Sequence, residues 1–295
     1  MKFEKLSPKC HRIILNFFDA QMKKSLFSDP SRKLMVSLYS LRPSFNPDVL
    51  NILSKHKIDL LEVLPVDEIE LLMAEFPTVI KFCQENINYR DVISSSPSSF
   101  LLPDSIVELC CGILSSKVKS TYLLYAGTSA FSFFFNEPSY KGFEPDKELW
   151  AFNQIFLDAA GTNADIRLSD DCTPNDRFDL IFAFPPISLK MTRSLRNTLQ
   201  EIAEWHLNKN CEMCLVLPLS FCNSIRGGWL TFKRTMLLSL QYSVMIITLS
   251  HKLFPNYHEP LCIVKFINNR KGRVTLVDAT SDEFLVRIDM AGIKG

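Results

Sequence analysis

A buried strand that runs directly into two prolines most constrains how this 295-residue chain folds. The run 178–182 reads Phe-Asp-Leu-Ile-Phe, and Pro185 and Pro186 follow after two more residues. Such a continuous apolar run is typical of a strand that is paired and buried in a sheet. Proline cannot donate to a sheet ladder and fixes its own φ, so the strand must end in a rigid loop. In open α/β sheets this carboxyl edge is where ligands bind.

The composition indicates a globular protein without a global basic field. Apolar residues make up 47% of the chain, which is enough for a sizeable core, and 33 Lys and Arg face 32 Asp and Glu. Any contact with DNA therefore needs a local patch or a partner. Nine cysteines without regular spacing are typical of buried thiols in a reducing compartment, so we expect a cytoplasmic protein. No run of eighteen apolar residues occurs, and no membrane span is expected.

Cys211 and Cys214 are the only pair at metal or redox spacing. They open an apolar run that ends at Pro218, and no second pair follows. We interpret the run as a core strand, with a zinc or redox site as the alternative. The five histidines show no metal spacing, so no metal site is predicted.

The pattern along the chain changes near residue 94. Residues 1–93 carry apolar side chains at helical spacing and predict a small helical domain, in which Pro47 begins a helix capped by Asn46. Residues 94–99 are a polar, serine-rich linker. Residues 100–295 alternate short apolar strands with helical segments, which predicts a mainly parallel sheet covered on both faces. The expected strands are 122–125, 140–144, 166–168, 178–182, 214–217, 244–249, 261–267 and 273–278, and the expected helices are 104–114, 147–160, 195–209 and 229–240.

Read in order, the segments from Phe100 to about Ala279 resemble the methylase domain of type I restriction-modification modification subunits. These are adenine-N6 DNA methyltransferases. The segments that carry the resemblance are the double-proline loop, 121–131, 141–145, the strand 214–218 with its Arg-Gly-Gly loop, and the closing strands. The resemblance implies an α/β fold: a Rossmann-like class I methyltransferase sheet preceded by the helical domain.

The resemblance also implies S-adenosylmethionine as cofactor. It places Gly127 and Thr128 in the cofactor loop, Glu144 at the ribose and Asp170 near the adenine amine. For each acid, a solvated loop carboxylate is the alternative. Leu123 stands where the family has Asp, and two loop glycines are replaced, so we expect impaired cofactor binding.

The catalytic loop of the family corresponds to Phe184, Pro185, Pro186 and Ile187. In that family an Asn and the first proline carbonyl accept hydrogen bonds from the flipped adenine, and an aromatic residue stacks on it. Phe184 replaces the Asn and Ile187 replaces the aromatic residue. Losing one oriented polar group at a reacting centre costs on the order of a hundredfold in rate.

Basic residues Arg226, Lys233 and Arg234 are candidates for contact with the DNA backbone, with a solvated charged face as the alternative. We expect a degenerate or very weakly active methyltransferase-family subunit that acts as a scaffold or DNA-facing partner in a restriction-modification-like assembly. Its protein partner would be a specificity subunit or a second methylase subunit. The alternatives are an active S-adenosylmethionine-dependent DNA adenine-N6 methyltransferase, and a small-molecule or peptide-binding module that uses the same strand-end crevice.

Overall fold

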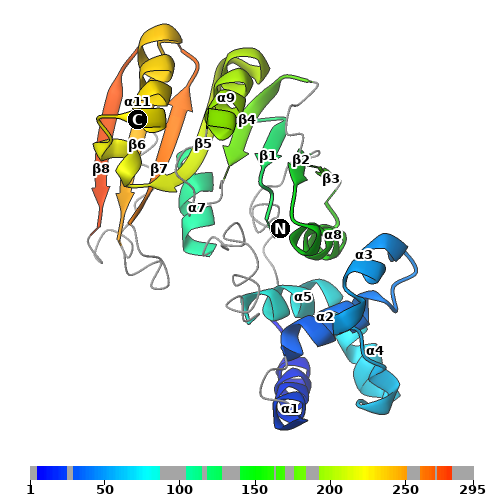
Figure 1. The fold of residues 1–295 in the computed structure, drawn as a ribbon. Helices are drawn as coiled ribbons and strands as arrows, with labels where there is room; N and C mark the ends of the chain where they lie inside the picture. Colours follow the sequence, from blue (N-terminus) through cyan, green and yellow to red (C-terminus); the bar gives the residue numbers. More distant parts are fainter. Residues whose placement is uncertain are drawn as a thin grey trace. The chain divides into compact units, whose positions relative to one another are not determined.

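The computed structural model describes residues 5–24, 29–86, 104–114, 118–127, 140–162, 164–169, 176–183, 193–250, 260–269 and 271–280. Their contacts group the chain into two compact units, a helical unit and a sheet unit (Figure 1). The predicted linker 94–99 lies outside the described residues, so the division into 1–93 and 100–295 stays a prediction.

The N-terminal part of the helical unit follows its proline and capping signals. Asp29 caps the helix that begins at Pro30, and its carboxylate accepts from Arg32 N at 3.0 Å. Asn46 caps the helix that begins at Pro47, as predicted, and accepts from the backbone N of Asp48 at 2.9 Å. The elements are α1 (Pro8–Lys24), α2 (Pro30–Tyr39), α3 (Pro47–Ile52), the 3₁₀ turns η1 (Ser54–His56) and η2 (Leu60–Glu62), α4 (Val66–Ala74) and α5 (Phe76–Glu85).

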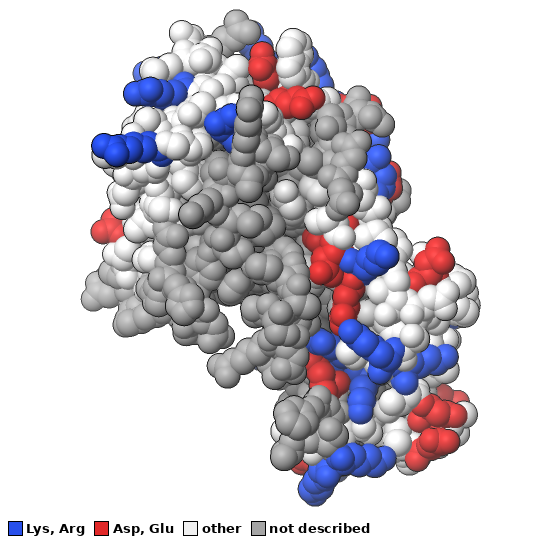
Figure 2. All heavy atoms as spheres, viewed as in Figure 1, with Lys and Arg blue, Asp and Glu red and all other residues white. Residues whose placement is uncertain are grey.

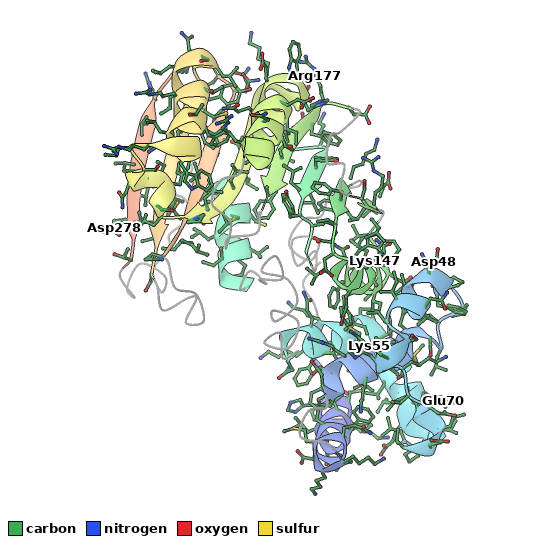
Figure 3. All side chains as sticks on the ribbon, viewed as in Figure 1. Asp48, Lys55, Glu70, Lys147, Arg177 and Asp278 are labelled. Carbon is green, nitrogen blue, oxygen red and sulfur yellow. The ribbon has the colours of Figure 1, made fainter. Side chains whose placement is uncertain are left out.

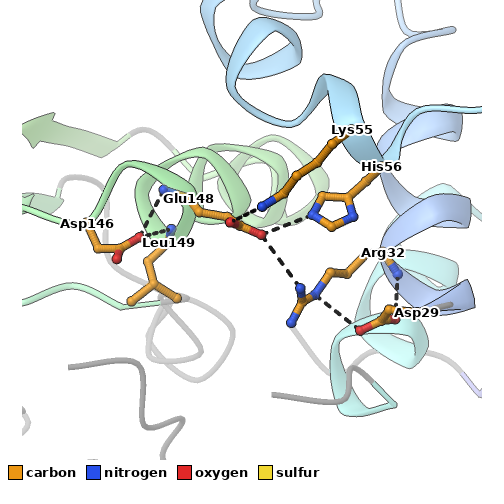
Figure 4. A network of polar contacts seen from close by, with 7 residues as sticks. All are labelled: Asp29, Arg32, Lys55, His56, Asp146, Glu148 and Leu149. Atoms are coloured by element: carbon orange, nitrogen blue, oxygen red, sulfur yellow. Dashed lines mark hydrogen bonds and ion pairs between the residues drawn. The ribbon is translucent and has the colours of Figure 1, made fainter. Parts of the chain in front are cut away.

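The helix α8 (Lys147–Ala160) also belongs to the helical unit, although it lies far along the chain. Its buried face joins the core that the N-terminal helices form, through Ala151, Phe152, Ile155, Phe156 and Ala159. Polar contacts add to this packing. The Glu148 carboxylate lies 2.7 Å from Lys55 Nζ, 3.0 Å from His56 Nε2 and 3.6 Å from Arg32 Nη1, and dashed lines mark these contacts in Figure 4.

The sheet unit is built on one eight-stranded sheet in the order β3-β2-β1-β4-β5-β7-β6-β8 (Figure 1). The strands β1 to β5 pair in parallel, β7 is antiparallel to both of its neighbours, and β8 is parallel to β6. The predicted α/β class is therefore confirmed. The bounds are β1 (Thr121–Leu124), β2 (Tyr140–Glu144), β3 (Ala164–Leu168), β4 (Phe178–Ala183), β5 (Leu207–Pro218), β6 (Ser243–Leu249), β7 (Leu261–Ile267) and β8 (Val274–Ala279).

Helices cover both faces of the sheet. One face carries Met213, Leu215 and Leu217 of β5, and it packs against α9 (Arg193–Glu201), α10 (Ser220–Asn223) and α11 (Gly227–Arg234). Strand alternation places Cys214 and Lys265 on the opposite face. Lys265 Nζ donates to the Ile113 carbonyl at 2.6 Å, so α7 (Asp104–Ile113) lies against that second face.

Two predicted helices end earlier than expected. The helix predicted over 229–240 corresponds to α11 (Gly227–Arg234), which a π-helical turn η5 (Thr235–Ser239) follows. The pattern predicts a helix over 195–209, whereas α9 ends at Glu201, a π-helical turn η4 (Ile202–His206) follows, and β5 begins at Leu207. Leu207 pairs with Phe178 of β4, and the register then shifts so that Leu180 faces Glu212. Asn210, within the extra residues, has a φ of 62°. A bulge interrupts the alternation of apolar and polar residues, so the sequence pattern does not show that these residues belong to the strand.

Candidate functional site

The predicted ligand site falls at the point where the strand order reverses. The strand β1 lies between β2 and β4, so the chain winds outward in one direction through β2 and β3 and in the other through β4 and β5. These five strands are parallel, and their carboxyl ends share one edge. In doubly wound sheets the crevice outside this switch point is where ligands bind. The cofactor-loop segment follows β1, and the double-proline segment follows β4.

Glu144 ends β2 at this edge and is hydrogen-bonded to Gly127, in the segment predicted to be the cofactor loop. Its Oε2 accepts from the backbone N of Gly127 at 2.7 Å. The residue is only 1% exposed, so a solvated loop carboxylate is excluded as its environment. Gly127 has a φ of 55°, a conformation that side chains with a Cβ rarely adopt. The turn at Gly127 is therefore held by a direct hydrogen bond to the acid at the end of β2.

The preceding part of the loop is held to β2 by its backbone. Ala126 N donates to the Phe143 carbonyl at 3.0 Å, and the Tyr125 ring lies 5.2 Å from the ring of Phe143. Tyr125 has a φ of 56°, which is uncommon for a bulky residue. The sequence pattern did not single out Tyr125, because a residue's φ leaves no mark in apolar periodicity. Such strained positions concentrate at functional sites.

Leu123 is part of the strand core. It is 2% exposed, and it pairs with Gly142 of β2 and Phe182 of β4. A Cβ at Gly142 would lie 2.4 Å from the Leu123 carbonyl oxygen, so β2 packs against β1 only because Gly142 has no side chain. The position where the resembled family carries Asp is therefore occupied here by a buried apolar side chain.

The other predicted site residues at this edge lie outside the described residues. They are Thr128, Asp170, Phe184, Pro185, Pro186 and Ile187. The assignments of these residues, and the roles of Gly127 and Glu144 toward a ligand, stay predictions.

Cys211 and Cys214 both lie in β5, as the core-strand interpretation predicts. Residues three apart in a strand point to opposite faces, so these two thiols do not converge on one ion. Cys211 Sγ lies 3.4 Å from the Asp179 carboxylate, and burial together with this carboxylate raises the pKa of Cys211 to about 12. Among the described residues, no group of three or more His, Cys, Asp or Glu side chains is placed to hold a metal.

The three candidate DNA-contact residues differ in their surroundings. Arg226 and Arg234 are exposed at the two ends of α11. Lys233 is half-buried, and its Nζ donates to the carbonyl oxygens of Cys222 at 3.0 Å and Ser224 at 2.8 Å. These bonds supply a donor to the carbonyls at the end of α10. Lys233 therefore has a structural role, whereas both arginines are accessible.

Both signs of charge lie on the described surface of each unit, as Figure 2 shows for one face. This mixture agrees with the near balance of basic and acidic residues in the sequence. Among the described residues, no helix is long and apolar enough to cross a membrane.

Comparison with solved structures identifies the class of fold. A Listeria monocytogenes protein assigned to the class I S-adenosylmethionine-dependent methyltransferases is 13% identical, with a TM-score of 0.66 and 97% of each chain covered. The type I restriction-modification methyltransferase subunit of Streptococcus thermophilus is 14% identical, with a TM-score of 0.62, over 100% of this chain and 76% of the other. No protein-family profile and no curated protein sequence matches this chain.

These likenesses show that the chain has the class I methyltransferase fold. The fold is shared with methyltransferase subunits of type I restriction-modification systems, so the resemblance seen in the sequence is confirmed at the level of the fold. At these identities the likeness shows architecture, and function must be argued from the site.

Proposed function

We propose that this protein is a noncatalytic or very weakly active relative of the adenine-N6 DNA methyltransferases. It acts as a scaffold or DNA-facing subunit of a restriction-modification-like assembly, together with a specificity subunit or a second methylase subunit. The fold supports the class, and the altered strand-end crevice supports the loss of activity.

The observation that carries this proposal is the chemistry at the carboxyl ends of β1 and β2. A cofactor with a charged amino-acid moiety needs a carboxylate or another polar group at its loop. Leu123 is buried in β1 at the position of the family's Asp, and one oxygen of Glu144 is already bonded to Gly127 N. At the end of β1 the chain therefore lacks the carboxylate with which the resembled family meets the charged end of S-adenosylmethionine.

The sequence of the catalytic loop supports the same conclusion. Phe184 has no polar atom to accept a hydrogen bond from an adenine amine, and Ile187 has no ring to stack on the base. Base–aromatic stacking contributes about 1–3 kcal/mol. Both replacements weaken the same methyl-transfer step.

Calorimetric titration with S-adenosylmethionine and S-adenosylhomocysteine tests the proposal. We expect no binding at millimolar ligand for the wild type, and likewise for a Glu144→Gln variant. Gln keeps an oxygen that accepts from Gly127 N, so this variant removes the charge and preserves the local geometry. Micromolar binding by the wild type that Glu144→Gln abolishes would overturn the proposal. It would support the active methyltransferase instead, to be followed by transfer assays on adenine-containing DNA.

A further inference from the structure

Two thiols meet at the carboxyl end of β5 in the sheet unit, and the proposed function assigns neither of them a role. Cys222 lies in α10, directly after β5, and Cys262 lies in β7, where it pairs with Leu217 of β5. Their sulfur atoms are 3.9 Å apart. The Cys262 thiol also lies 3.7 Å from the Pro218 carbonyl oxygen, toward which it donates.

The surroundings of Cys222 favour its thiolate. Lys233 Nζ donates to the Cys222 carbonyl at 3.0 Å and lies 5.7 Å from the ring centroid of Phe221. Once Cys222 is ionised, the Cys262 S–H turns from the Pro218 carbonyl to donate to the Cys222 sulfur. This hydrogen bond lowers the pKa of Cys222, and the charge of Lys233 lowers it further against the opposing effect of burial. Cys222 is only half-buried, so a small oxidant reaches it.

Two other described thiols of the sheet unit, Cys110 and Cys211, have surroundings that disfavour the thiolate. Burial raises the pKa of Cys110 well above its usual range, and its neighbour Cys214 raises it further. Cys211 is half-buried like Cys222, yet its pKa rises to about 12 because it is partly buried beside Asp179. Proximity of two thiols and partial exposure therefore each occur elsewhere among the described cysteines of the unit, and of these cysteines only Cys222 combines both with a nearby cation.

We propose that Cys222 and Cys262 are a reversible oxidation site that forms an internal disulfide on exposure to peroxide. The Cys222 thiolate attacks a peroxide oxygen, the O–O bond breaks, and Cys222 becomes a sulfenic acid with release of hydroxide. Cys262 then loses its proton, and its sulfur attacks the Cys222 sulfur and displaces the hydroxyl group. In total, two thiols and one hydrogen peroxide give one disulfide and two waters, and the peroxide is the species reduced.

The bond requires only local movement. A disulfide of about 2.05 Å requires the two sulfurs, which lie 3.9 Å apart, to approach by roughly 2 Å, a distance within the reach of side-chain rotation. The product ties α10 to β7 at the same sheet edge that carries Gly127 and Glu144. Oxidation therefore stiffens the β5 end of that edge.

Intact mass and peptide mapping after treatment of the full chain with hydrogen peroxide test this assignment. We expect a loss of two hydrogens, a cross-linked peptide pair that contains Cys222 and Cys262, and full reversal by dithiothreitol. Cys222→Ser abolishes the product. Cys262→Ser leaves a Cys222 sulfenic acid that dimedone traps. Cys110→Ser, which disrupts the buried thiol pair, serves as the matched control and forms the cross-link at the wild-type rate.

Iodoacetamide labelling of the reduced protein gives a second readout that needs no variant. Cys222 should react at least about tenfold faster than Cys211 at pH 7.5, because the thiolate is the nucleophile. Equal labelling rates would overturn the proposal. The proposal would also be overturned if peroxide gave the folded wild-type protein no disulfide, or disulfides between other cysteines only.

Discussion

Replacing Glu148 with Gln should weaken the helical unit at neutral pH. The carboxylate lies 3.0 Å from His56 Nε2 and 2.7 Å from Lys55 Nζ (Figure 4). The bond to His56 is the largest cause that lowers the pKa of Glu148 from 4.5 to about 2, and Lys55 adds to it. Gln keeps the volume of the side chain and removes its charge.

The magnitude follows from the pKa difference. Without screening, a shift from 4.5 to about 2 corresponds to about 3 kcal/mol between the two protonation states. The Glu148 side chain keeps 23% of its surface exposed, and solvent screens its pair with the exposed Lys55. We therefore expect Glu148→Gln to lower the free energy of unfolding by about 1–2 kcal/mol at pH 7.

The pH dependence has a definite sign. Because the folded pKa lies below the unfolded one, the stabilisation is complete above about pH 5 and is lost as the pH falls from 4.5 toward 2. The difference between wild type and variant should therefore shrink as the pH falls from 5 to 3.

Hydrogen exchange of peptides from α2, η1 and α8 reports on the helical unit separately from the sheet. Denaturant titration gives the free energy of unfolding. Glu70 is exposed on α4 (Figure 3), and Glu70→Gln is the matched control, expected to leave both readouts unchanged. Equal stability of wild type and Glu148→Gln at pH 7 would refute the reasoning. A difference that stays constant between pH 7 and pH 3 would also refute it.

Two further predictions concern the sheet unit. Lys265 Nζ lies 2.8 Å from the buried carboxylate of Glu212, so Lys265→Met removes the cation of this pair and should lower the free energy of unfolding in urea by about 3–5 kcal/mol. Adding Glu212→Leu should restore most of that loss. A double variant as unstable as Lys265→Met alone would contradict this prediction. If α11 contacts DNA, Arg226→Ala and Arg234→Ala should each reduce the salt slope of duplex binding by about 1, measured by fluorescence anisotropy, without changing Tm. Lys233→Met should instead lower Tm, because α10 loses the donor to its last carbonyls. If Lys233→Met reduces the salt slope and leaves Tm unchanged, Lys233 is the phosphate contact and its structural role is refuted.

Much of the architecture was predictable because local signals agree with it. The apolar run before the double proline and the alternation of strands with helices were enough to predict the parallel core of the sheet. The start of α3 was predictable because an Asn cap followed by proline leaves the chain few other conformations. The order of the family-like segments also led to the class of fold that the solved structures confirm.

Other features depend on contacts between residues far apart in the sequence, which periodicity does not contain. The length of β5 depends on pairing with β4 across a bulge, and the grouping of α8 with α2, α3 and α5 depends on a shared core. The burial of Glu144 and its bond to Gly127 arise because β1 and β2 are neighbours, with Gly142 allowing their close approach.

The sequence by itself determined the class of fold and the segments that follow each strand. Only the tertiary structure decided which of the described side chains at those strand ends meet. Cys222 and Cys262 show the difference most clearly, because they lie on elements separated by forty positions and come together only when β7 pairs antiparallel to β5. Strand pairing joins residues far apart in the sequence, so a pair of thiols that it brings together cannot be predicted from local sequence patterns.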